Sequence, residues 1–269
     1  MTLMARTSKK TPSQSRTRKT SRKIVEDEEL RDFNIPQLKQ KITIQSKKLD
    51  DKQLRFLEKS LHENTNLMFV VGPAGAAKTY MAVYSALRIL SSNDDMDLLY
   101  IRTPVEASER SMGFLPGNVE EKFDPYLWPL QDKLDEFLPK EKSTQSELLK
   151  EGRISGMPNG FVRGADWKNK VVVCDEAQNF TYDELKTLIT RVGENSRLFL
   201  CGDLMQSDIG RKSGLKEVMG IFSSGHWQKS EKSHVFEFEV KDIKRCEFVM
   251  EAVQSFIEHE IERDKTNGR

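Results

Sequence analysis

The sequence feature that most constrains the fold is a loop rich in glycine and alanine, set between a strand-length apolar run and a helical pattern. The apolar run spans residues 67–71, and apolar residues recur at helical spacing from Met81 to Leu90. The loop reads Gly72-Pro73-Ala74-Gly75-Ala76-Ala77-Lys78-Thr79, with Tyr80 directly after it. It follows the pattern GxxxxGK[ST] except at one position. Backbone N–H groups and the positive end of the helix dipole hold phosphate in such a loop, so the sequence predicts a nucleotide site here.

Individual side chains of this loop have predictable roles in a nucleotide site. Lys78 would reach the β- and γ-phosphates, and the hydroxyl of Thr79 would ligate Mg²⁺. Ala77 stands where the pattern has glycine. Its methyl group is expected to be tolerable only if the local φ is negative. We expect nucleotide to bind despite Ala77, and the departure to bear on the rate of turnover more than on binding.

Two acidic residues follow a second apolar run much further along the chain. The run is Val171 to Cys174, and Asp175 and Glu176 come directly after it. A carboxylate at the end of a neighbouring strand is what Mg²⁺ needs opposite Thr79, which favours Asp175 as a metal-ordering residue. Glu176 is then placed to activate water as a general base.

A third apolar run ends in a polar tip. Residues 198–201 are followed by Gly202, Asp203 and, three positions later, Gln206. Gln206 is expected to hydrogen-bond the γ-phosphate or the attacking water.

Strand-length runs alternate with helical patterns along most of the chain. Further strands are predicted at 98–102 and at 235–240, the latter a half-exposed edge strand, and helices at 49–61, 119–138, 181–192, 215–222 and 248–261. Prolines at 125 and 129 should kink or split the second of these helices, and 148–164 is expected to be irregular. Continuous apolar strands between helices predict an α/β fold of the P-loop NTPase class, with a mostly parallel sheet covered by helices on both faces. A single domain is expected over 49–269, after a connector at 24–48.

The first 23 residues differ from the rest in charge. They contain eight Lys and Arg residues and no acid, so removing +8 from the net charge of +1 leaves about −7 for the remainder. Such a segment is either a disordered, solubilising tail or an arm that binds nucleic acid by releasing counterions. It lacks the apolar core of a secretory signal, and no apolar stretch in the sequence reaches the length of a membrane helix. The three cysteines and four histidines show no metal-ligand spacing, which favours reduced thiols in a cytoplasmic protein.

Four segments in this order and spacing resemble the PhoH-like ATPase family, whose core is similar to the first RecA-like domain of superfamily 1 helicases. They are GPAGAAKTY at 72–80, IRTPVEASERSMGFLPGNVEEKFDPYLWPL at 101–130, VVVCDEAQNFTYDELKTLITRVG at 171–193 and LFLCGDLMQSD at 198–208. The resemblance runs from about Gln53 to Val249. It implies a RecA-like fold, binding and hydrolysis of ATP, a ring-like homo-oligomer that is often a hexamer, and a role in RNA metabolism.

The resemblance also implies roles for residues outside the loop. Gln53 matches a glutamine that reads adenine, and Arg102 precedes a loop that would face RNA or a neighbouring subunit. Arg191 and Arg245 match arginines that would contact the γ-phosphate, in cis or across a subunit interface. The chain departs from the family at Ala77 and in two other segments, where 207–210 and 245–247 replace Asp-Leu-Pro and Arg-His-Pro.

The leading hypothesis is a Mg²⁺-dependent ATPase that moves or remodels RNA or another nucleic acid. A P-loop kinase is an alternative, although adjacent acids and the polar tip favour activation of water and no arginine-rich lid is evident. A GTPase is disfavoured because the sequence has no Asn-Lys-x-Asp motif. A non-catalytic, nucleotide-dependent switch is the third hypothesis, since Ala77 would slow turnover.

Overall fold

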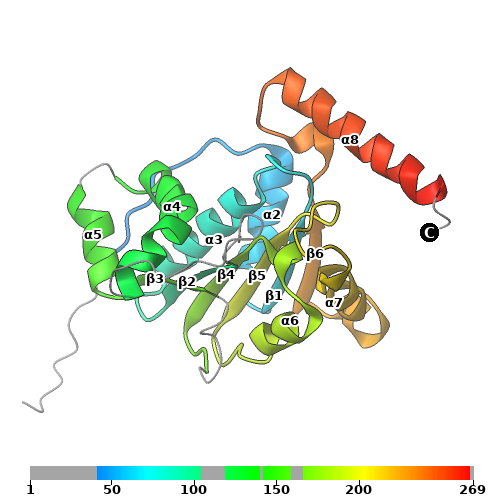
Figure 1. The fold of residues 1–269 in the computed structure, drawn as a ribbon. Coiled ribbons are helices and arrows are strands. Elements are labelled where there is room, and N and C mark those ends of the chain that lie inside the picture. Colours follow the sequence, from blue (N-terminus) through cyan, green and yellow to red (C-terminus); the bar gives the residue numbers. More distant parts are fainter. Residues whose placement is uncertain (1–40, 104–118, 140–141, 159–165, 267–269) are drawn as a thin grey trace, which may run out of the picture. The chain divides into compact units, whose positions relative to one another are not determined.

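The computed structural model describes residues 41–103, 119–139, 142–158 and 166–266. Within them, six strands form one sheet in the order β3-β2-β4-β5-β1-β6 (Figure 1). The strands are β1 (Leu67–Val71), β2 (Asp97–Arg102), β3 (Ile154–Pro158), β4 (Lys170–Asp175), β5 (Arg197–Gly202) and β6 (Ser233–Glu237). Every neighbouring pair is parallel, which confirms the predicted fold class.

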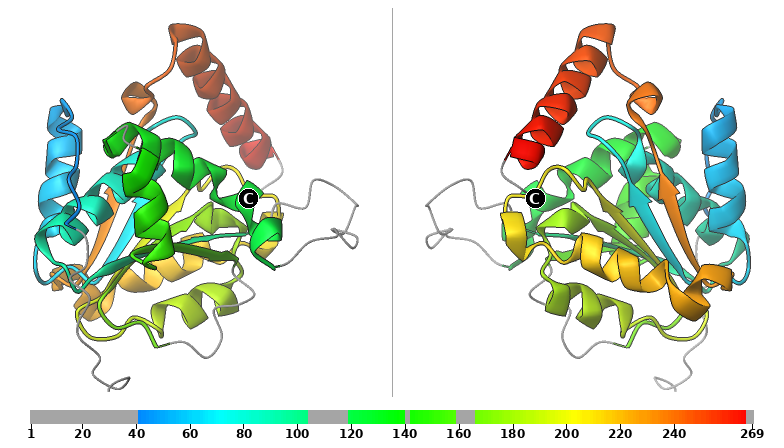
Figure 2. Two further views of the ribbon diagram at one scale, coloured as in Figure 1. Left: turned by 90° about the vertical axis from the view of Figure 1, so that its left-hand side faces the viewer. Right: turned by 90° about the vertical axis from the view of Figure 1, so that its right-hand side faces the viewer.

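Helices cover both faces of this sheet (Figures 1 and 2). They are α2 (Asp51–Leu61), α3 (Lys78–Ser92), α4 (Val119–Phe137), α5 (Lys142–Lys150), α6 (Tyr182–Ile189) and α7 (Leu215–Phe222). The last helix, α8 (Glu247–Thr266), extends beyond the sheet. Short 3-10 turns lie at Ala177–Asn179, Gly210–Lys212, Gly225–Lys229 and Val240–Asp242. The predicted alternation of strands and helices is therefore present, with small shifts at the element ends.

Alternate residues of the central strands feed two separate cores. On one face, Met68 and Val70 of β1 pack with side chains from α2, α3 and α4. On the other, Leu67 and Phe69 pack with side chains from α6 and α7. All five residues of β1 are buried, because a strand covered on both faces has no solvent side. This explains why the strands appear in the sequence as continuous apolar runs.

The parallel register brings the ends of four strands to one edge of the sheet. Arg102 pairs with Asp175 across β2 and β4, and Val71 pairs with Gly202 across β1 and β5. The loop after β1, the acids after β4 and the tip after β5 thus emerge side by side. In open α/β sheets this carboxyl edge is where ligands bind.

The region from Leu148 to Gly164 was expected to be irregular, and this expectation is wrong for its described part. Residues 142–150 form α5, and Ile154–Pro158 form β3, the edge strand beside β2. The strand was hard to recognise because it is short and contains Gly156 and Pro158. A β-carbon at Gly156 would lie 2.0 Å from Cδ2 of Leu127, so glycine allows α4 to approach this strand closely.

Helix α4 is continuous over 119–137, so of the two expected effects of its prolines, a kink or a split, the split is wrong. Each proline removes one helical hydrogen bond. Leu130, Leu134 and Phe137 are each no more than 1% exposed, and their burial stabilises the helix.

The N-terminal segments fall largely outside the described residues. The basic tail at 1–23 and most of the connector lie there, so their boundaries stay predictions. From residue 41 the chain contacts α4, since Ile42 is buried and Gln45 hydrogen-bonds the carbonyls of Phe137 and Leu138. Among the helices of the described part, none combines the length and the apolar character needed to cross a membrane.

Candidate nucleotide site

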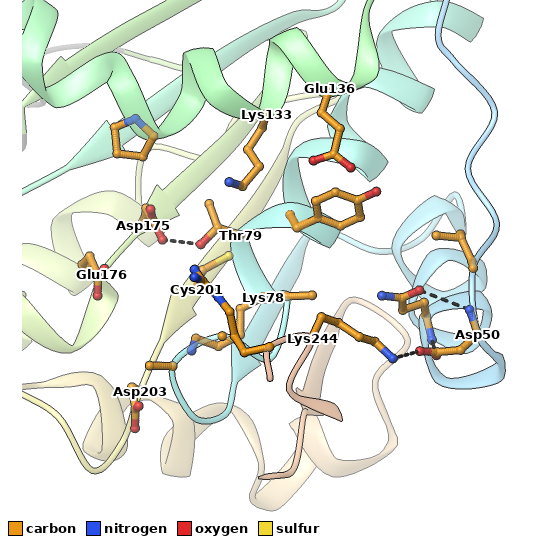
Figure 3. A pocket seen from close by; sticks show the side chains of 18 of the residues that line it. Asp50, Lys78, Thr79, Lys133, Glu136, Asp175, Glu176, Cys201, Asp203 and Lys244 are labelled. Atoms are coloured by element: carbon orange, nitrogen blue, oxygen red, sulfur yellow. Dashed lines mark hydrogen bonds and ion pairs between the residues drawn. The ribbon is translucent and has the colours of Figure 1, made fainter. Parts of the chain in front are cut away.

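A cleft of about 940 Å³ opens at the carboxyl edge of the sheet (Figure 3). Its walls come from the loop after β1, the ends of β2, β4 and β5, the start of α2, one side of α4 and the segment before α8. The lining residues are Lys48, Leu49, Asp50, Gln53, Ala74, Gly75, Ala77, Lys78, Thr79, Tyr80, Arg102, Pro129, Lys133, Glu136, Asp175, Glu176, Cys201, Asp203, Gln206, Lys244 and Arg245.

Most sequence-predicted site residues meet in this cleft. The loop at 72–79 joins β1 to α3 as predicted, and Lys78 is the first residue of α3. Its Nζ donates hydrogen bonds to the carbonyls of Gly72 at 2.7 Å and Pro73 at 2.8 Å. Burial lowers the pKa of Lys78, and the nearby Asp203 opposes that shift. The lysine is thus folded over its own loop, where an incoming phosphate can replace the two carbonyls as its partner.

Ala77 has a φ of 65°, in the left-handed region. The expectation that an alanine here would have negative φ is therefore wrong. The turn into α3 requires a left-handed residue at its N-cap, and glycine enters that region without a steric penalty. An alanine there costs about 1–2 kcal/mol. The loop keeps its shape, but under backbone strain.

Thr79 and Asp175 join the first two motifs. Thr79 Oγ1 donates to Asp175 Oδ1 at 2.6 Å, across 96 positions of sequence (Figure 3). The other carboxylate oxygen, Oδ2, accepts from the Tyr100 hydroxyl, also at 2.6 Å. Burial and the neighbouring Asp175 raise the pKa of Tyr100, so its hydroxyl stays protonated and is a donor. Both carboxylate oxygens are thereby fixed.

Glu176 lies at the rim of this arrangement with its side chain 38% exposed. Arg102 Nη2 is 3.4 Å from Oε1, and Gln178 Nε2 donates to Oε2 at 2.6 Å. Gln178 is itself buried, and its Oε1 accepts from the backbone N–H of Asp203 at 3.0 Å. One amide therefore connects the acid after β4 to the tip after β5.

The tip after β5 is held to the neighbouring turn at both ends. Besides the Asp203 contact, Asn179 Nδ2 donates to Asp208 Oδ2, and Asn179 Oδ1 accepts from the Asp208 N–H. Between these anchors, Gln206 is exposed and lines the cleft, where the sequence placed it.

Gln53 also lines the cleft and is only 7% exposed. It forms a capping box with Asp50, in which Gln53 Oε1 accepts from the Asp50 N–H and Asp50 Oδ1 accepts from the Gln53 N–H. Lys244 pairs with Asp50 at 2.7 Å, and its N–H donates to the carbonyl of Gly75. Gln53 is therefore both a structural cap and a wall of the cleft.

The predicted arginines separate into two groups. Arg102 and Arg245 line the cleft. Arg191 does not, and the expectation that it could act in cis is wrong. It follows α6, and its carbonyl accepts from the N–H of Trp167, which precedes β4. Arg191 therefore lies near the amino ends of the strands, at the opposite edge of the sheet from the cleft.

Sequence reasoning missed Tyr100 and Gln178. Tyr100 lies within an apolar strand, where it pairs with Val173, so its nearness to Asp175 follows from the sheet register alone. Gln178 comes two residues after Glu176, which was a usable signal for a side chain at the same edge. The wall formed by Lys133 and Glu136 of α4 was also missed, because its placement depends on how that helix packs.

The oxygen atoms in the cleft suit a hard cation held mainly by phosphate and water. Across the described ranges, no group of three or more His, Cys, Asp or Glu side chains converges on one point. Mg²⁺ commonly uses one or two protein oxygens, keeps several waters and takes the rest of its ligands from phosphates. Thr79 and Asp175 fit that pattern.

Comparison with known proteins identifies the family of this chain. The family described as PhoH-like protein matches residues 43–257. The chain belongs to the PhoH-like family. Its P-loop, the following acids and the parallel sheet make it a nucleotide-binding P-loop protein of that family.

Curated relatives of this PhoH-like chain come from several bacteria. A PhoH-like protein of Mycobacterium tuberculosis (strain H37Rv) is 34% identical over 220 residues, which cover 81% of this chain and 59% of that protein. One from Synechocystis is 40% identical over 158 residues, covering 58% and 47%. Protein PhoH of Escherichia coli K12 is 34% identical over 175 residues, covering 64% and 49%. The matched part spans about half to three-fifths of the length of these relatives.

Solved structures give weaker likenesses. The Pif1 helicase of Candida albicans matches 71% of the PhoH-like chain and 40% of its own, with 15% identity and a TM-score of 0.35. The UvsW helicase of bacteriophage T4 matches 78% and 66%, with 12% identity and a TM-score of 0.43. Both scores are low, so the strand order and register described above establish the fold instead.

The strain at Ala77 leads to a stability prediction. Replacing Ala77 with Gly should raise the free energy of unfolding by about 1 kcal/mol, because the left-handed penalty disappears. Urea denaturation of both proteins measures the difference. Ala74→Gly is the matched control in the same loop, since Ala74 is exposed and does not have positive φ. That control should be neutral or mildly destabilising, and an equal gain in both variants would contradict the assignment of strain to Ala77.

Proposed function

We propose that this chain is a Mg²⁺-dependent ATPase. The observation that carries the proposal is the 2.6 Å hydrogen bond between Thr79 and Asp175. It joins the phosphate loop to the acid pair, and it puts a metal-binding hydroxyl, a metal-ordering carboxylate and a candidate base at one edge of the sheet. ATP hydrolysis needs these groups together.

Each group has a distinct task in the proposed reaction. The loop N–H groups and Lys78 would bind the β- and γ-phosphates, with Thr79 and Asp175 holding Mg²⁺. The metal would neutralise charge that develops on the phosphate oxygens. Glu176 would accept the proton of the attacking water. Donors from Arg102 and Gln178 orient that carboxylate.

Further contacts to the γ-phosphate would come from Gln206 and Arg245, which both line the cleft. Arg245 passes over the P-loop: a β-carbon added to Gly75 would lie 3.2 Å from its Cγ. A guanidinium that reaches the transferred phosphoryl group can contribute several powers of ten in rate.

A nucleotide-dependent switch is the second candidate, and the strained Ala77 favours it. If the strain hinders the loop geometry needed for chemistry, nucleotide would bind and turn over slowly. A kinase is less favoured, because Glu176 is oriented by two donors beside the phosphate site, as suits a base that activates water.

Coupling to RNA or another nucleic acid is the wider part of the proposal. It rests on membership of the PhoH-like family and on the basic segment at 1–23. A homo-oligomer is part of it too, because Arg191 lies away from the cleft of its own chain and would meet a γ-phosphate only across a subunit interface.

Glu176→Gln is the direct test of hydrolysis. The amide keeps the size of the side chain but cannot accept the proton, so the turnover number should fall by about 10²–10⁴ while ATP affinity stays within a few-fold. Phosphate release in a single turnover and equilibrium binding of ATP measure the two quantities.

Glu194→Gln is the control for that test, since Glu194 is exposed and outside the cleft. It should hydrolyse ATP like the parent chain. Undiminished hydrolysis by Glu176→Gln would rule out the role of Glu176 as base. Binding without phosphate release by the parent chain itself would favour the switch.

Gln53→Glu tests whether the amide reads adenine. Glutamate at this capping-box position keeps the hydrogen bond to the Asp50 N–H, so the cap of α2 is retained. The variant loses the amide donor, and its ATP affinity should drop about tenfold, or about 1.4 kcal/mol, with a smaller preference for ATP over GTP. Competition binding measures both values, with the exposed Gln228→Glu as control. An unchanged ratio of ATP to GTP affinity would show that Gln53 acts only as a helix cap and does not read adenine.

Solution mass and RNA stimulation test the wider proposal. We expect light scattering to show an oligomer when ATP is present, and single-stranded RNA to raise the rate of ATP hydrolysis. Arg191→Ala should then lower the turnover number without changing ATP affinity. A monomer that hydrolyses ATP at full rate, unaffected by RNA, would contradict both the interface role of Arg191 and the coupling.

A further inference from the structure

The carboxylate of Asp175 is held between two hydroxyl groups from different elements. Thr79, from the start of α3, donates to Oδ1, and Tyr100, from the middle of β2, donates to Oδ2, each at 2.6 Å. Asp175 is 6% exposed and Tyr100 is 1% exposed. Terminal carboxylate torsions are broad and have little intrinsic preference. The plane of this carboxylate is therefore set by its two partners.

Tyr100 is a rigid partner because of where its strand lies. Strand β2 is hydrogen-bonded on both sides, to β3 and to β4, and Tyr100 pairs directly with Val173, two residues before Asp175. Its aromatic ring belongs to the core between the sheet and α3. Packing thus immobilises the ring, and the position of its hydroxyl beside Asp175 is fixed.

We propose that Tyr100 is a positioning residue for the Mg²⁺ site, and that its hydroxyl fixes Asp175 in the orientation that orders the metal. This inference rests on the proposed ATPase function and adds a residue that is not part of the cleft lining. Hydrogen-bond partners of metal-binding groups typically influence metal affinity 10- to 100-fold when removed.

The hydroxyl is the part of Tyr100 that matters for this role. Phenylalanine would fill the same space in the core, so packing alone does not require an oxygen here. Thr79 cannot orient the carboxylate alone, because a single hydrogen bond to Oδ1 leaves rotation about that contact possible. Without the Tyr100 donor, Oδ2 would also be a buried acceptor without its present partner, and rotation toward the open cleft would relieve this.

Tyr100→Phe tests the inference through metal dependence. Binding of a non-hydrolysable ATP analogue is measured by calorimetry over a series of Mg²⁺ concentrations and in EDTA. We expect the Mg²⁺ concentration for half-maximal tight binding to rise about tenfold in the variant. Affinity in EDTA should be unchanged, since the P-loop and Lys78 are untouched. A loss that is equal with and without Mg²⁺ would show a general structural defect and overturn the proposal.

Tyr84→Phe is the matched control, because Tyr84 is also buried, on α3, and its ring packs on Phe137 outside the cleft lining. It should show the parent Mg²⁺ dependence. If Tyr100→Phe does not fold, Tyr100→Leu takes its place, since leucine keeps an apolar side chain in the core without a donor and the same shift is expected. A parent chain whose analogue binding ignores Mg²⁺ would refute the ATPase proposal itself, whereas a normal parent with an unshifted variant would refute only the role of Tyr100.

Discussion

The contact between Thr79 and Asp175 is possible only because the central strands are parallel. Thr79 follows β1 and Asp175 ends β4, and β5 lies between these two strands in the sheet. Parallel strands end at one edge, so a helix that begins after β1 points its first turn at the acid of a strand two places away. The cores on both faces fix that sheet, and each buried apolar residue contributes about 1.5–3 kcal/mol to doing so. Packing far from the cleft thereby determines its geometry.

Several charged side chains lie at the same edge of the sheet, and burying any one of them alone would be unfavourable. Lys78 is largely desolvated, which lowers its pKa, and Asp203, Glu176 and Asp175 lie close enough to offset part of that shift. On the other side of the cleft, Arg102 faces Glu176. Buried charges need partners, and here cations and anions lie close to one another. A phosphate that binds Lys78 replaces carbonyl contacts with a stronger charge-assisted one, so the site is prepared for anions without a large rearrangement.

How far the site could be predicted from sequence depended on whether a residue's role is local. Lys78, Thr79, Asp175 and Glu176 each follow an apolar strand directly, so a pattern along the chain revealed them. Tyr100 is different, because its role depends on which residue of β4 it pairs with. The register between two strands cannot be inferred from the sequence of one of them. The prediction that Arg191 acts in cis was wrong for a related reason. The sequence shows that Arg191 follows a helix, but not at which edge of the sheet it lies. In the fold, β3 was missed because pairing with β2, rather than its own composition, makes it a strand.

Ala77 shows that the shape of the phosphate loop is imposed by its surroundings. An alanine in the left-handed region costs about 1–2 kcal/mol, yet the turn is kept. Several contacts over-determine it: Lys78 bonds the carbonyls of Gly72 and Pro73, the Met81 N–H bonds the Ala77 carbonyl, and the Lys244 N–H bonds that of Gly75. Each such hydrogen bond contributes about 1 kcal/mol net, so their sum exceeds the strain at Ala77. The cost of alanine therefore falls on the stability of the loop rather than on its ability to accept phosphate. Strain of this kind would affect turnover only if the loop has to move during the reaction.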